Sequence, residues 1–359
     1  MKIVQVLTSL AYGDAIGNDV LAMKKAFQHM GYNTEILAEH IDRRLPEGTA
    51  KPINRLAQLE EDDIIIYHFS TGTLLNYTVA QCKARLIVYY HNITPPEFFH
   101  GYSPMAEASC QDGLKAAKYL AEKAEYCWAV SEFNRQDLIE LGFKQDIKIL
   151  PILIPFDDYK KEPRKEIIQR YGNDGVVNIL FTGRVAPNKK HEDVIKSFYY
   201  YKKYINERSR LFLVGGYDEK DRYYQKLQRY VRELGVSDVI FPGHIKFDEI
   251  LAYYRVADVF LCMSEHEGFC VPLVEAMQFQ VPVVAYASTA IPDTLAEGGL
   301  LVEEKDPRYV ALAIHRVVTD KTLTNYIRKK QKERLKDFAY EVIYKQLKEI
   351  IVEIAGESE

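Results

Sequence analysis

The sequence is poor in the features that mark disulfide-rich or zinc-stabilised proteins. Its 359 residues include five cysteines, an odd number, without a C-x-x-C pair or a cysteine–histidine cluster. This spacing argues against a disulfide framework and a structural zinc site, and a reducing cytoplasm is the simplest location. The cysteines stand far apart, at positions 82, 110, 127, 262 and 270.

Long apolar runs are also missing. The run at the N-terminus ends at Thr8 and Ser9, which makes it too short for the core of a signal peptide. No uncharged stretch approaches the roughly 18 residues that a membrane-spanning helix needs. We therefore expect any contact with a membrane to be made from its surface.

Neither an excess of one charge nor a D-x-D motif is present. The chain has 47 Lys and Arg against 51 Asp and Glu, a net charge of -4, so nothing in its overall charge favours a nucleic-acid partner. A D-x-D pair commonly holds Mg²⁺ or Mn²⁺ against a diphosphate, and its absence from the sequence predicts that no metal cofactor is needed.

Short apolar runs alternate with segments of helical spacing along most of the chain. This alternation is typical of parallel sheets built from βαβ units, and it restarts after the charged, proline-containing stretch 155–172. It predicts an α/β protein with two doubly wound parallel-sheet domains in tandem. The predicted strands are 2–7, 33–38, 63–67, 86–90, 126–130, 177–182, 210–215, 238–241, 258–263, 282–286 and 299–302.

Ligands of open parallel sheets bind beyond the carboxyl ends of the strands, so the residues after each predicted strand are the candidates. Gly13, Asp14 and Gly17 follow the first strand. Their G-x-x-x-G spacing differs from that of dinucleotide sites, and the Asp14 carboxylate suits a sugar hydroxyl better than a pyrophosphate. His91 and Asn92 follow the fourth strand. A ligand-free turn at the glycines and a structural role for His91 remain alternatives.

Two cations follow the first strand of the second half. Gly183 and Arg184 come directly after the strand at 177–182, and Lys189 lies five residues after Arg184, before a predicted helix. An arginine fork, a lysine charge and a helix N-terminus can act together on one anion, such as a diphosphate. The alternative is a solvated surface without a ligand.

The stretch from Glu267 to Glu275 is the most informative one. Gly268 frees the backbone after a strand, and the proline that follows Cys270 and Val271 suits the first turn of a helix, so nearby N–H groups can bind phosphate oxygens. The flanking carboxylates can accept hydrogen bonds from sugar hydroxyls. The alternatives are that both glutamates only favour the positive end of a helix dipole, or that they form the carboxylate pair of a hydrolase.

Taken in order, these motifs resemble those of the retaining GT-B fold glycosyltransferases of family 4, the group 1 glycosyltransferases. The signature is the E-x7-E element from Glu267 to Glu275, and the resemblance covers nearly the whole chain. One departure is the first loop, which reads G-D-A-I-G where the family commonly has adjacent glycines. The supporting motifs are His91-Asn92, Val130-Ser131-Glu132 and Gly183-Arg184 with Lys189.

The resemblance implies a division of the chain into Rossmann-like domains. It implies an acceptor-binding domain at 1–155, a nucleotide-sugar-binding domain at 156–335, and a C-terminal helix at 336–359 that packs back on the first domain. The residues implied to be catalytic are His91, Arg184, Lys189 and Glu267. On the donor side the expected residues are Gly183, Arg184, Lys189, His244, Ile245, Glu267, Gly268, Phe269, Cys270, Val271 and Glu275. On the acceptor side they are Gly13, Asp14, Gly17, His91 and Asn92.

The resemblance also implies roles for the individual residues. In such enzymes the residues matching Arg184 and Lys189 bind the donor diphosphate, that matching Glu267 contacts the transferred sugar, and that matching Glu275 contacts the ribose. The residue matching His91 lies beside the anomeric centre. Activity is typically metal-independent and retains the anomeric configuration, by a front-face displacement in which the leaving phosphate helps to deprotonate the acceptor hydroxyl.

The expected partners are a UDP- or GDP-sugar donor and a saccharide or lipid-linked saccharide acceptor in cell-surface polysaccharide or glycolipid synthesis. Alternatives are a sugar-nucleotide epimerase or phosphorylase of the same fold, and a non-catalytic sugar-nucleotide-binding protein. Two groups of cations suggest reversible contact of a cytoplasmic enzyme with the inner face of the plasma membrane, although a solvated surface explains either group alone. They are Lys115, Lys118 and Lys123, and Arg328, Lys329, Lys330, Lys332, Arg334 and Lys336.

Overall fold

The structure is a computed structural model that describes residues 1–356, and the chain divides into two compact units. The first unit consists of Met1–Glu97, Met105–Pro155 and the C-terminal segment from Asp337, and the second of Phe98–Pro104 and Phe156–Lys336. Residues 98–104 therefore differ from the expected assignment to the first domain. The reason is aromatic packing within the second unit, where the ring of Tyr102 lies 5.3 Å from that of Tyr223.

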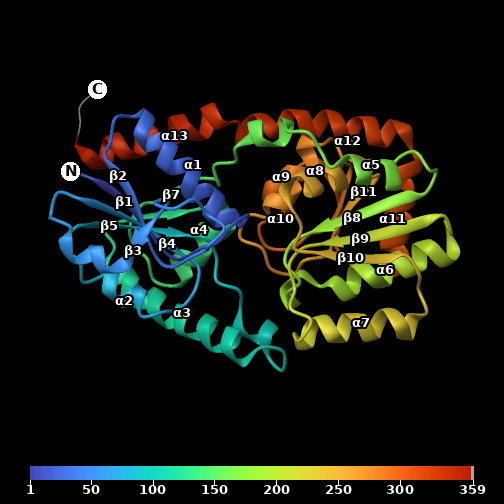
Figure 1. Ribbon diagram of the computed structural model, residues 1–359, viewed down its shortest axis with the longest axis horizontal. Helices are drawn as coiled ribbons and strands as arrows, with labels where there is room; N and C mark the ends of the chain where they lie inside the picture. Colours follow the sequence, from blue (N-terminus) through green and yellow to red (C-terminus); the bar gives the residue numbers. More distant parts are fainter. Residues whose placement is uncertain (357–359) are drawn as a thin grey trace. The chain divides into compact units, whose positions relative to one another are not determined.

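A seven-stranded parallel sheet forms the core of the first unit (Figure 1), in the order β3-β2-β1-β4-β5-β6-β7. Every residue of β4 is buried, as its continuous apolar sequence predicts for a strand covered on both faces. The strands are β1 (Ile3–Leu10), β2 (Thr34–Ile41), β3 (Lys51–Pro52), β4 (Ile64–Phe69), β5 (Arg85–Tyr90), β6 (Tyr126–Ala129) and β7 (Ile147–Ile149).

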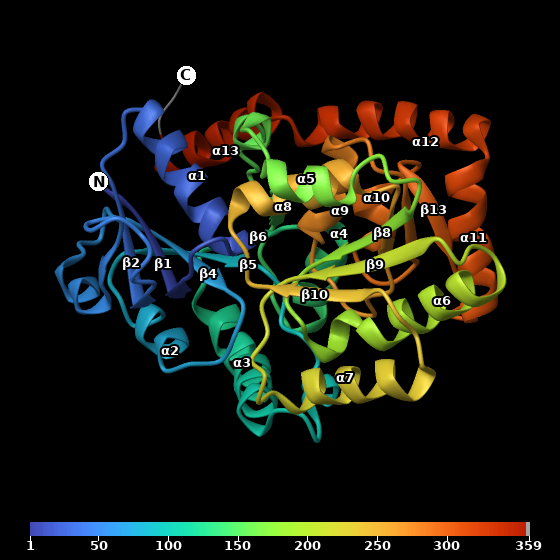
Figure 2. The same ribbon diagram turned by 45° about the vertical axis from the view of Figure 1, so that its right-hand side comes forward.

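Helices cover both faces of this sheet. In both views α1 and α13 lie on one face, and α2 and α3 on the other (Figures 1 and 2). The last helix is tied to the sheet by a hydrogen bond of 2.6 Å from Arg85 Nη1 to the carbonyl of Ile354. The helices are α1 (Ala15–His29), α2 (Leu75–Val79), α3 (Pro104–Lys123), α4 (Glu132–Glu140) and α13 (Tyr340–Ala355), with short 3₁₀ turns at Ile53–Gln58 and Pro96–Phe99.

The second unit is built on a six-stranded parallel sheet in the order β10-β9-β8-β11-β12-β13. Its strands are β8 (Val177–Thr182), β9 (Ser209–Val214), β10 (Val239–Gly243), β11 (Val259–Cys262), β12 (Val283–Tyr286) and β13 (Gly299–Val302). Helices α6 and α11 lie on one side of it, and α8 and α9 on the other (Figures 1 and 2). The helices are α5 (Lys165–Tyr171), α6 (His191–Tyr204), α7 (Arg222–Leu234), α8 (Phe247–Val256), α9 (Val271–Gln278), α10 (Ile291–Leu295), α11 (Pro307–Thr319) and α12 (Lys321–Arg334).

The architecture confirms the predicted pair of doubly wound, Rossmann-like α/β domains. All eleven predicted strands are present within a few residues of their predicted bounds. Sequence reasoning missed β3 and β7, because two or three residues at a sheet edge carry almost no periodicity. The chain leaves the helix between α12 and α13, where Ala339 is extended at φ -57° and ψ 141°.

In each sheet the order of the strands reverses beside the first strand of its unit. Strand β1 pairs with both β2 and β4, and β8 pairs with both β9 and β11. Ligand sites of doubly wound sheets lie at this reversal, beyond the carboxyl ends of the strands. The loops that leave β8 and β11 are therefore neighbours, although they are about 80 residues apart in sequence.

Candidate functional site

The loop after β8 turns sharply at Gly183, which lies against a second glycine that follows β9. Gly183 adopts φ 146° and donates its N–H to the carbonyl of Val214 at 2.9 Å. A Cβ on Gly215 would lie 1.9 Å from the Gly183 carbonyl oxygen, so no other residue fits there. Arg184 follows this turn with an exposed side chain, and it has no hydrogen bond or ion pair with another residue of the described chain.

Lys189 and Glu267, which the sequence analysis placed in separate roles, form one ion pair. Lys189 Nζ lies 2.6 and 2.5 Å from the two carboxylate oxygens of Glu267, and the side chains are 20% and 7% exposed. Asn188 holds the two loops together. Its side-chain amide donates to the backbone carbonyl of His266 at 3.0 Å, and its backbone carbonyl accepts the N–H of Glu265 at 2.9 Å. The adjacency of β8 and β11 brings these loops together.

The electrostatics of the pair keep the Lys189 side chain charged. Burial lowers the pKa of Lys189, but the neighbouring Glu267 carboxylate outweighs it and the pKa is raised overall. Two of the three ammonium donors point at Glu267, which leaves one for another acceptor. The pair is therefore a pre-positioned hydrogen-bond donor that carries no net charge.

A second ion cluster lies next to this pair and was missed from the sequence. Glu265 accepts Lys305 at 2.8 Å and Lys190 at 3.0 Å, and Lys305 also reaches Asp193 at 2.8 Å. Burial raises the pKa of Glu265, and the two lysines more than reverse this effect, so the pKa is lowered. Lys305 comes from beyond β13, and no local motif in the sequence indicates its position.

The loop after β11 leads into the N-terminus of α9, as the sequence predicts. Cys270 is the residue before the helix and has left-handed backbone angles of φ 68° and ψ 64°, and a proline occupies the first turn. Phe269 is buried, and its carbonyl accepts the hydroxyl of Thr294 at 2.6 Å. Gly268 is buried and Val271 half-buried, so the backbone before α9 is fixed by packing.

Glu275 is held by two tyrosines. The hydroxyl of Tyr159 donates to one carboxylate oxygen at 2.8 Å and that of Tyr254 to the other at 2.7 Å. Because Tyr254 gives its only proton to Glu275, the hydroxyl of Thr182, 2.6 Å away, must be the donor to Tyr254. Burial raises the pKa of Glu275, partly offset by the two hydroxyls. Nothing in the local sequence points to either tyrosine.

The two remaining residues that the sequence predicts on the nucleotide-sugar side follow β10. His244 is exposed and lies against Gly216, where a Cβ would come within 3.9 Å of its ring. Ile245 is half-buried beside it. Gly243 needs its φ of 80° to make this turn.

In the first unit, the loop after β1 has a structural explanation. The Asp14 carboxylate caps α1 by accepting the N–H of Gly17 at 3.4 Å. A Cβ on Gly17 would lie 2.7 Å from the carbonyl of Ala11, and Gly13 has a φ of 76°. Ser131 likewise caps α4 by accepting the N–H of Asn134 at 3.1 Å. These contacts fit the alternative of turns that form without a ligand.

His91 follows β5 and belongs to a buried polar cluster. Its Nε2 lies 2.8 Å from Nδ1 of His68, whose Nε2 lies 3.1 Å from the side-chain oxygen of Gln5. Burial lowers the pKa of His91 to about 3, so the ring is neutral near pH 7. Asn92, beside it, adopts a φ of 83°. Asp19 on α1 completes the cluster, and burial raises its pKa to about 7.

Two groups of side chains in residues 1–356 bring three potential metal ligands within 4.8 Å of one another: Asp19, His68 and His91, and Cys262, Glu267 and Cys270. In the second group Glu267 is already neutralised by Lys189. The pKa of Cys270 is raised well above its usual value by its hydrogen bond with Cys262 and by burial, so its thiol stays protonated and is a poor ligand.

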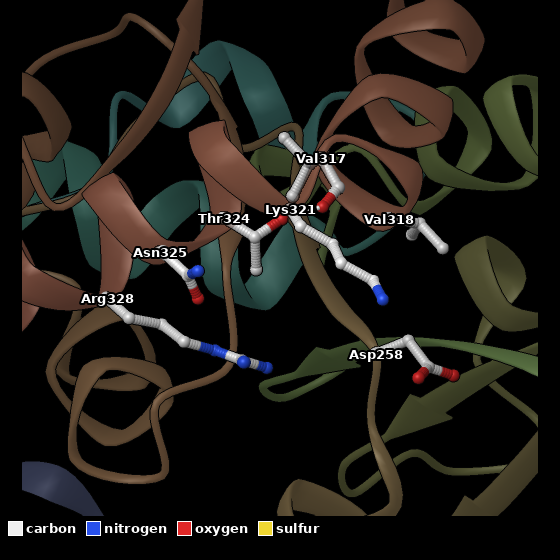
Figure 3. A pocket seen from close by; sticks show the side chains of 7 residues that line it. All are labelled: Asp258, Val317, Val318, Lys321, Thr324, Asn325 and Arg328. Carbon is white, nitrogen blue, oxygen red and sulfur yellow. Dashed lines mark hydrogen bonds between the residues drawn. The ribbon is translucent and has the colours of Figure 1, made fainter.

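A pocket of about 260 Å³ in the second unit lies elsewhere (Figure 3). It is lined by Asp258, Val317, Val318, Lys321, Thr324, Asn325 and Arg328. Asp258 directly precedes β11, so the pocket lies at the amino end of that strand, opposite the end that carries Glu267. It is therefore separate from the ion-pair site.

The comparison with protein families identifies the second unit. Residues 163–334 match the family described as glycosyl transferases group 1. The chain contains a group 1 glycosyltransferase domain. This match spans β8 to α12 and therefore includes Arg184, Lys189, Glu267 and Glu275.

Curated relatives extend the similarity beyond that domain. The O-antigen chain mannosyltransferase B of Escherichia coli is 24% identical over 277 residues, which are 74% of this chain and 70% of that protein. A GDP-mannose-dependent alpha-(1-6)-phosphatidylinositol monomannoside mannosyltransferase of Mycolicibacterium smegmatis is 26% identical over 57% of this chain and 56% of its own length. The matched regions thus span 70% and 56% of the lengths of these two relatives.

Solved structures share the fold of the whole chain. Sucrose-phosphate synthase from Thermosynechococcus elongatus superposes with a TM-score of 0.78 at 18% identity and covers 100% of both chains. Anabaena Alr3699/HepE in complex with UDP-glucose gives a TM-score of 0.77 at 19% identity over 98% of this chain and 100% of that one. The predicted GT-B fold of this chain is confirmed.

Proposed function

We propose that this chain is a retaining, metal-independent glycosyltransferase that transfers a hexosyl group from a UDP- or GDP-sugar to a hydroxyl of a saccharide or lipid-linked saccharide in cell-surface polysaccharide or glycolipid synthesis. The observation that carries the proposal is the arrangement at the carboxyl ends of β8 and β11. There an exposed arginine without a partner in residues 1–356 follows one strand, and the Lys189–Glu267 pair joins the loops of both.

The arrangement suits a departing nucleoside diphosphate. Negative charge grows on the leaving phosphate during transfer, and pre-positioned cations and N–H donors stabilise it without reorganising. Arg184, the free donor of Lys189 and the N-terminus of α9 supply these groups from one unit of the chain. The Glu267 carboxylate, held in place by Lys189, is suited to accept a hydrogen bond from a sugar hydroxyl.

The choice of donor is guided by the relatives. The GDP-mannose-dependent relative of Mycolicibacterium smegmatis makes GDP-mannose the first candidate donor, and the Anabaena complex makes UDP-glucose the second. We propose to incubate the protein in the presence of EDTA with each of these donors and with mannose-containing acceptors, either lipid-linked or free. Release of the nucleoside diphosphate together with a glycosylated product of unchanged anomeric configuration supports the proposal.

Other products contradict the proposal. Interconversion of the sugar nucleotide without an acceptor indicates an epimerase. Binding of nucleoside diphosphates without turnover of any donor indicates a sugar-nucleotide-binding protein. Inverted anomeric configuration in the product contradicts the retaining part alone.

Membrane contact is a separate part of the proposal. Among residues 1–356 no helix is long and apolar enough to cross a bilayer. Several of the basic residues suggested for surface contact are engaged within the protein, since Lys330 pairs with Glu297 at 2.8 Å and Arg334 bonds the carbonyl of Asp293 at 2.6 Å. Lys329, Lys332 and Lys336 remain exposed. We propose weak, salt-sensitive binding to anionic lipid of roughly 1 kcal/mol per cation, and failure to sediment with anionic vesicles at low salt contradicts it.

A further inference from the structure

The polar cluster in the first unit crosses three adjacent strands. Gln5 is on β1, His68 on β4 and His91 directly after β5, and these strands pair in the order β1-β4-β5. Gln5 pairs with Ile66, and His68 lies two residues after Ile66 on β4. In the same way, His68 pairs with Tyr89, and His91 lies two residues after Tyr89. Side chains two residues apart point to the same face of a sheet, which explains how the three side chains meet.

The direction of the first hydrogen bond in this cluster is fixed by the backbone. The amide nitrogen of Gln5 lies 2.9 Å from the carbonyl oxygen of Val20 on α1. A carbonyl can only accept, so the nitrogen of the Gln5 amide faces Val20 and its oxygen faces His68. The oxygen in turn can only accept, and His68 must therefore carry a proton on Nε2 to make its 3.1 Å contact.

The same logic sets the protonation of His91. Burial and the neighbouring His91 lower the pKa of His68 well below its usual value, so His68 has one ring proton, and that proton is on Nε2. Its Nδ1 is then an acceptor, and the 2.8 Å contact needs a proton on Nε2 of His91. His91 is also neutral, so its Nδ1 carries a lone pair and no proton.

That nitrogen has no partner within the described chain. Nδ1 of His91 is a buried atom without a hydrogen bond, and the side chain is only 9% exposed. Asp19 makes no hydrogen bond with this nitrogen, since its Oδ1 accepts the N–H of Leu153 at 2.8 Å and its Oδ2 is buried without a hydrogen bond within residues 1–356. A buried acceptor that is left without a donor costs free energy unless a ligand satisfies it.

We propose that Gln5 and His68 are positioning residues that hold His91 in its Nε2–H tautomer, so that Nδ1 presents a hydrogen-bond acceptor to a hydroxyl of the sugar substrate. A metal ion is a poorer occupant of this cluster, because both ring nitrogens of His68 are committed to Gln5 and His91. The tautomer follows from the hydrogen bonds together with the neutral state of both rings, whereas its consequence for transfer rests on the proposed function.

The tautomer can be observed without any activity. We propose to record long-range ¹H–¹⁵N spectra of the ¹⁵N-histidine-labelled full chain at pH 7, with His68→Asn and His91→Gln used to assign two of the nine histidines. The expected result is a neutral His91 and a neutral His68, each protonated on Nε2. In Gln5→Leu, which removes the fixed acceptor, His91 is expected to become a mixture of tautomers. A proton on Nδ1 of His91, or a charged ring, in the unmodified protein overturns the inference, whether or not the protein transfers sugar.

Two substitutions of His68 test the catalytic consequence. The side-chain oxygen of His68→Asn occupies the place of Nδ1 and still accepts from His91, whereas His68→Gln places its amide near Nε2 and loses that acceptor. We expect kcat/KM to fall roughly three- to tenfold in His68→Gln, the effect of one neutral hydrogen bond, and to stay within about twofold in His68→Asn. Equal losses in both variants, with equal melting temperatures, overturn the positioning role. If neither variant nor the parent transfers sugar while the spectra show the expected tautomer, the proposed function fails and the tautomer assignment stands.

Discussion

The Lys189–Glu267 pair makes a prediction that separates folding from ligand binding. Both partners are largely removed from water, with exposed fractions of 20% and 7%. Replacing one partner leaves the other as a buried charge without a counter-ion, which typically costs about 3–5 kcal/mol. We therefore expect Lys189→Met and Glu267→Gln each to lower the stability of the second unit by that amount, or its melting temperature by roughly 6–20 °C.

The double variant gives the sharper test. With neither charge present, nothing is left unpaired, and neutral replacement of a buried pair often costs little. Lys189→Met/Glu267→Gln is therefore expected to be more stable than either single variant. Calorimetric scans of the four proteins form a double-mutant cycle, and effects that simply add would refute the reasoning.

Arg184→Ala is the matched control for the same cycle. Its side chain is exposed and has no partner within residues 1–356. The free energy of unfolding should therefore change by no more than about 0.5 kcal/mol, as for ordinary surface substitutions. Binding of UDP or GDP, measured by titration calorimetry, should nevertheless weaken by on the order of 1.5–3 kcal/mol, because a charge-assisted contact to phosphate is lost. Unchanged affinity for both nucleotides would contradict the assignment of the diphosphate to Arg184.

Three further predictions concern other groups. Tyr254→Phe removes a hydroxyl 2.7 Å from the Glu275 carboxylate and should destabilise the second unit by about 1.5–3 kcal/mol in a thermal scan, whereas the half-exposed Tyr224→Phe should not. Burial raises the pKa of Asp19 from 3.8 to about 7, so the folded state binds the carboxyl proton more tightly than the unfolded state does. The contribution of Asp19 to the free energy of unfolding should therefore fall as the pH rises from about 4 to about 7, by up to roughly 1.4 kcal/mol per pH unit. Urea unfolding of Asp19→Asn should lack this part of the pH dependence, and identical curves for both proteins would count against it. Transfer activity should survive EDTA, as expected from the absent D-x-D motif, and full loss restored by Mn²⁺ or Mg²⁺ would show that a metal is needed.

The fold could be predicted because each parallel strand is a short apolar run followed by a turn or a polar loop, and that signal is local. The candidate residues Arg184, Lys189, Glu267 and Glu275 could be proposed in the same way, since they follow such runs. What could not be predicted is how they are held. The Lys189–Glu267 contact depends on the adjacency of β8 and β11, and strand order is not contained in local spacing.

The supporting residues were missed for the same reason. Tyr159 and Tyr254 reach Glu275 from 116 and 21 residues away, and a tyrosine in an apolar helix is indistinguishable from one that only packs. His68 lies within β4, and no local motif in the sequence marks it, because its hydrogen bond is with Gln5 from a different strand. Buried polar side chains acquire their meaning from partners that only the tertiary structure supplies.

The charge balance at the candidate donor site indicates which residue dominates its salt dependence. Lys189 is neutralised by Glu267, and Lys190 and Lys305 are balanced by Glu265 and Asp193. Arg184 is the cation after β8 that no carboxylate of residues 1–356 neutralises, so it supplies the net positive charge that a diphosphate meets. Because screening by salt weakens exposed charges more than buried pairs, the affinity for nucleoside diphosphate should fall with ionic strength chiefly through Arg184. On this proposal we expect the hydrogen bonds from Lys189 and from the start of α9 to set the geometry of binding, which salt should change little.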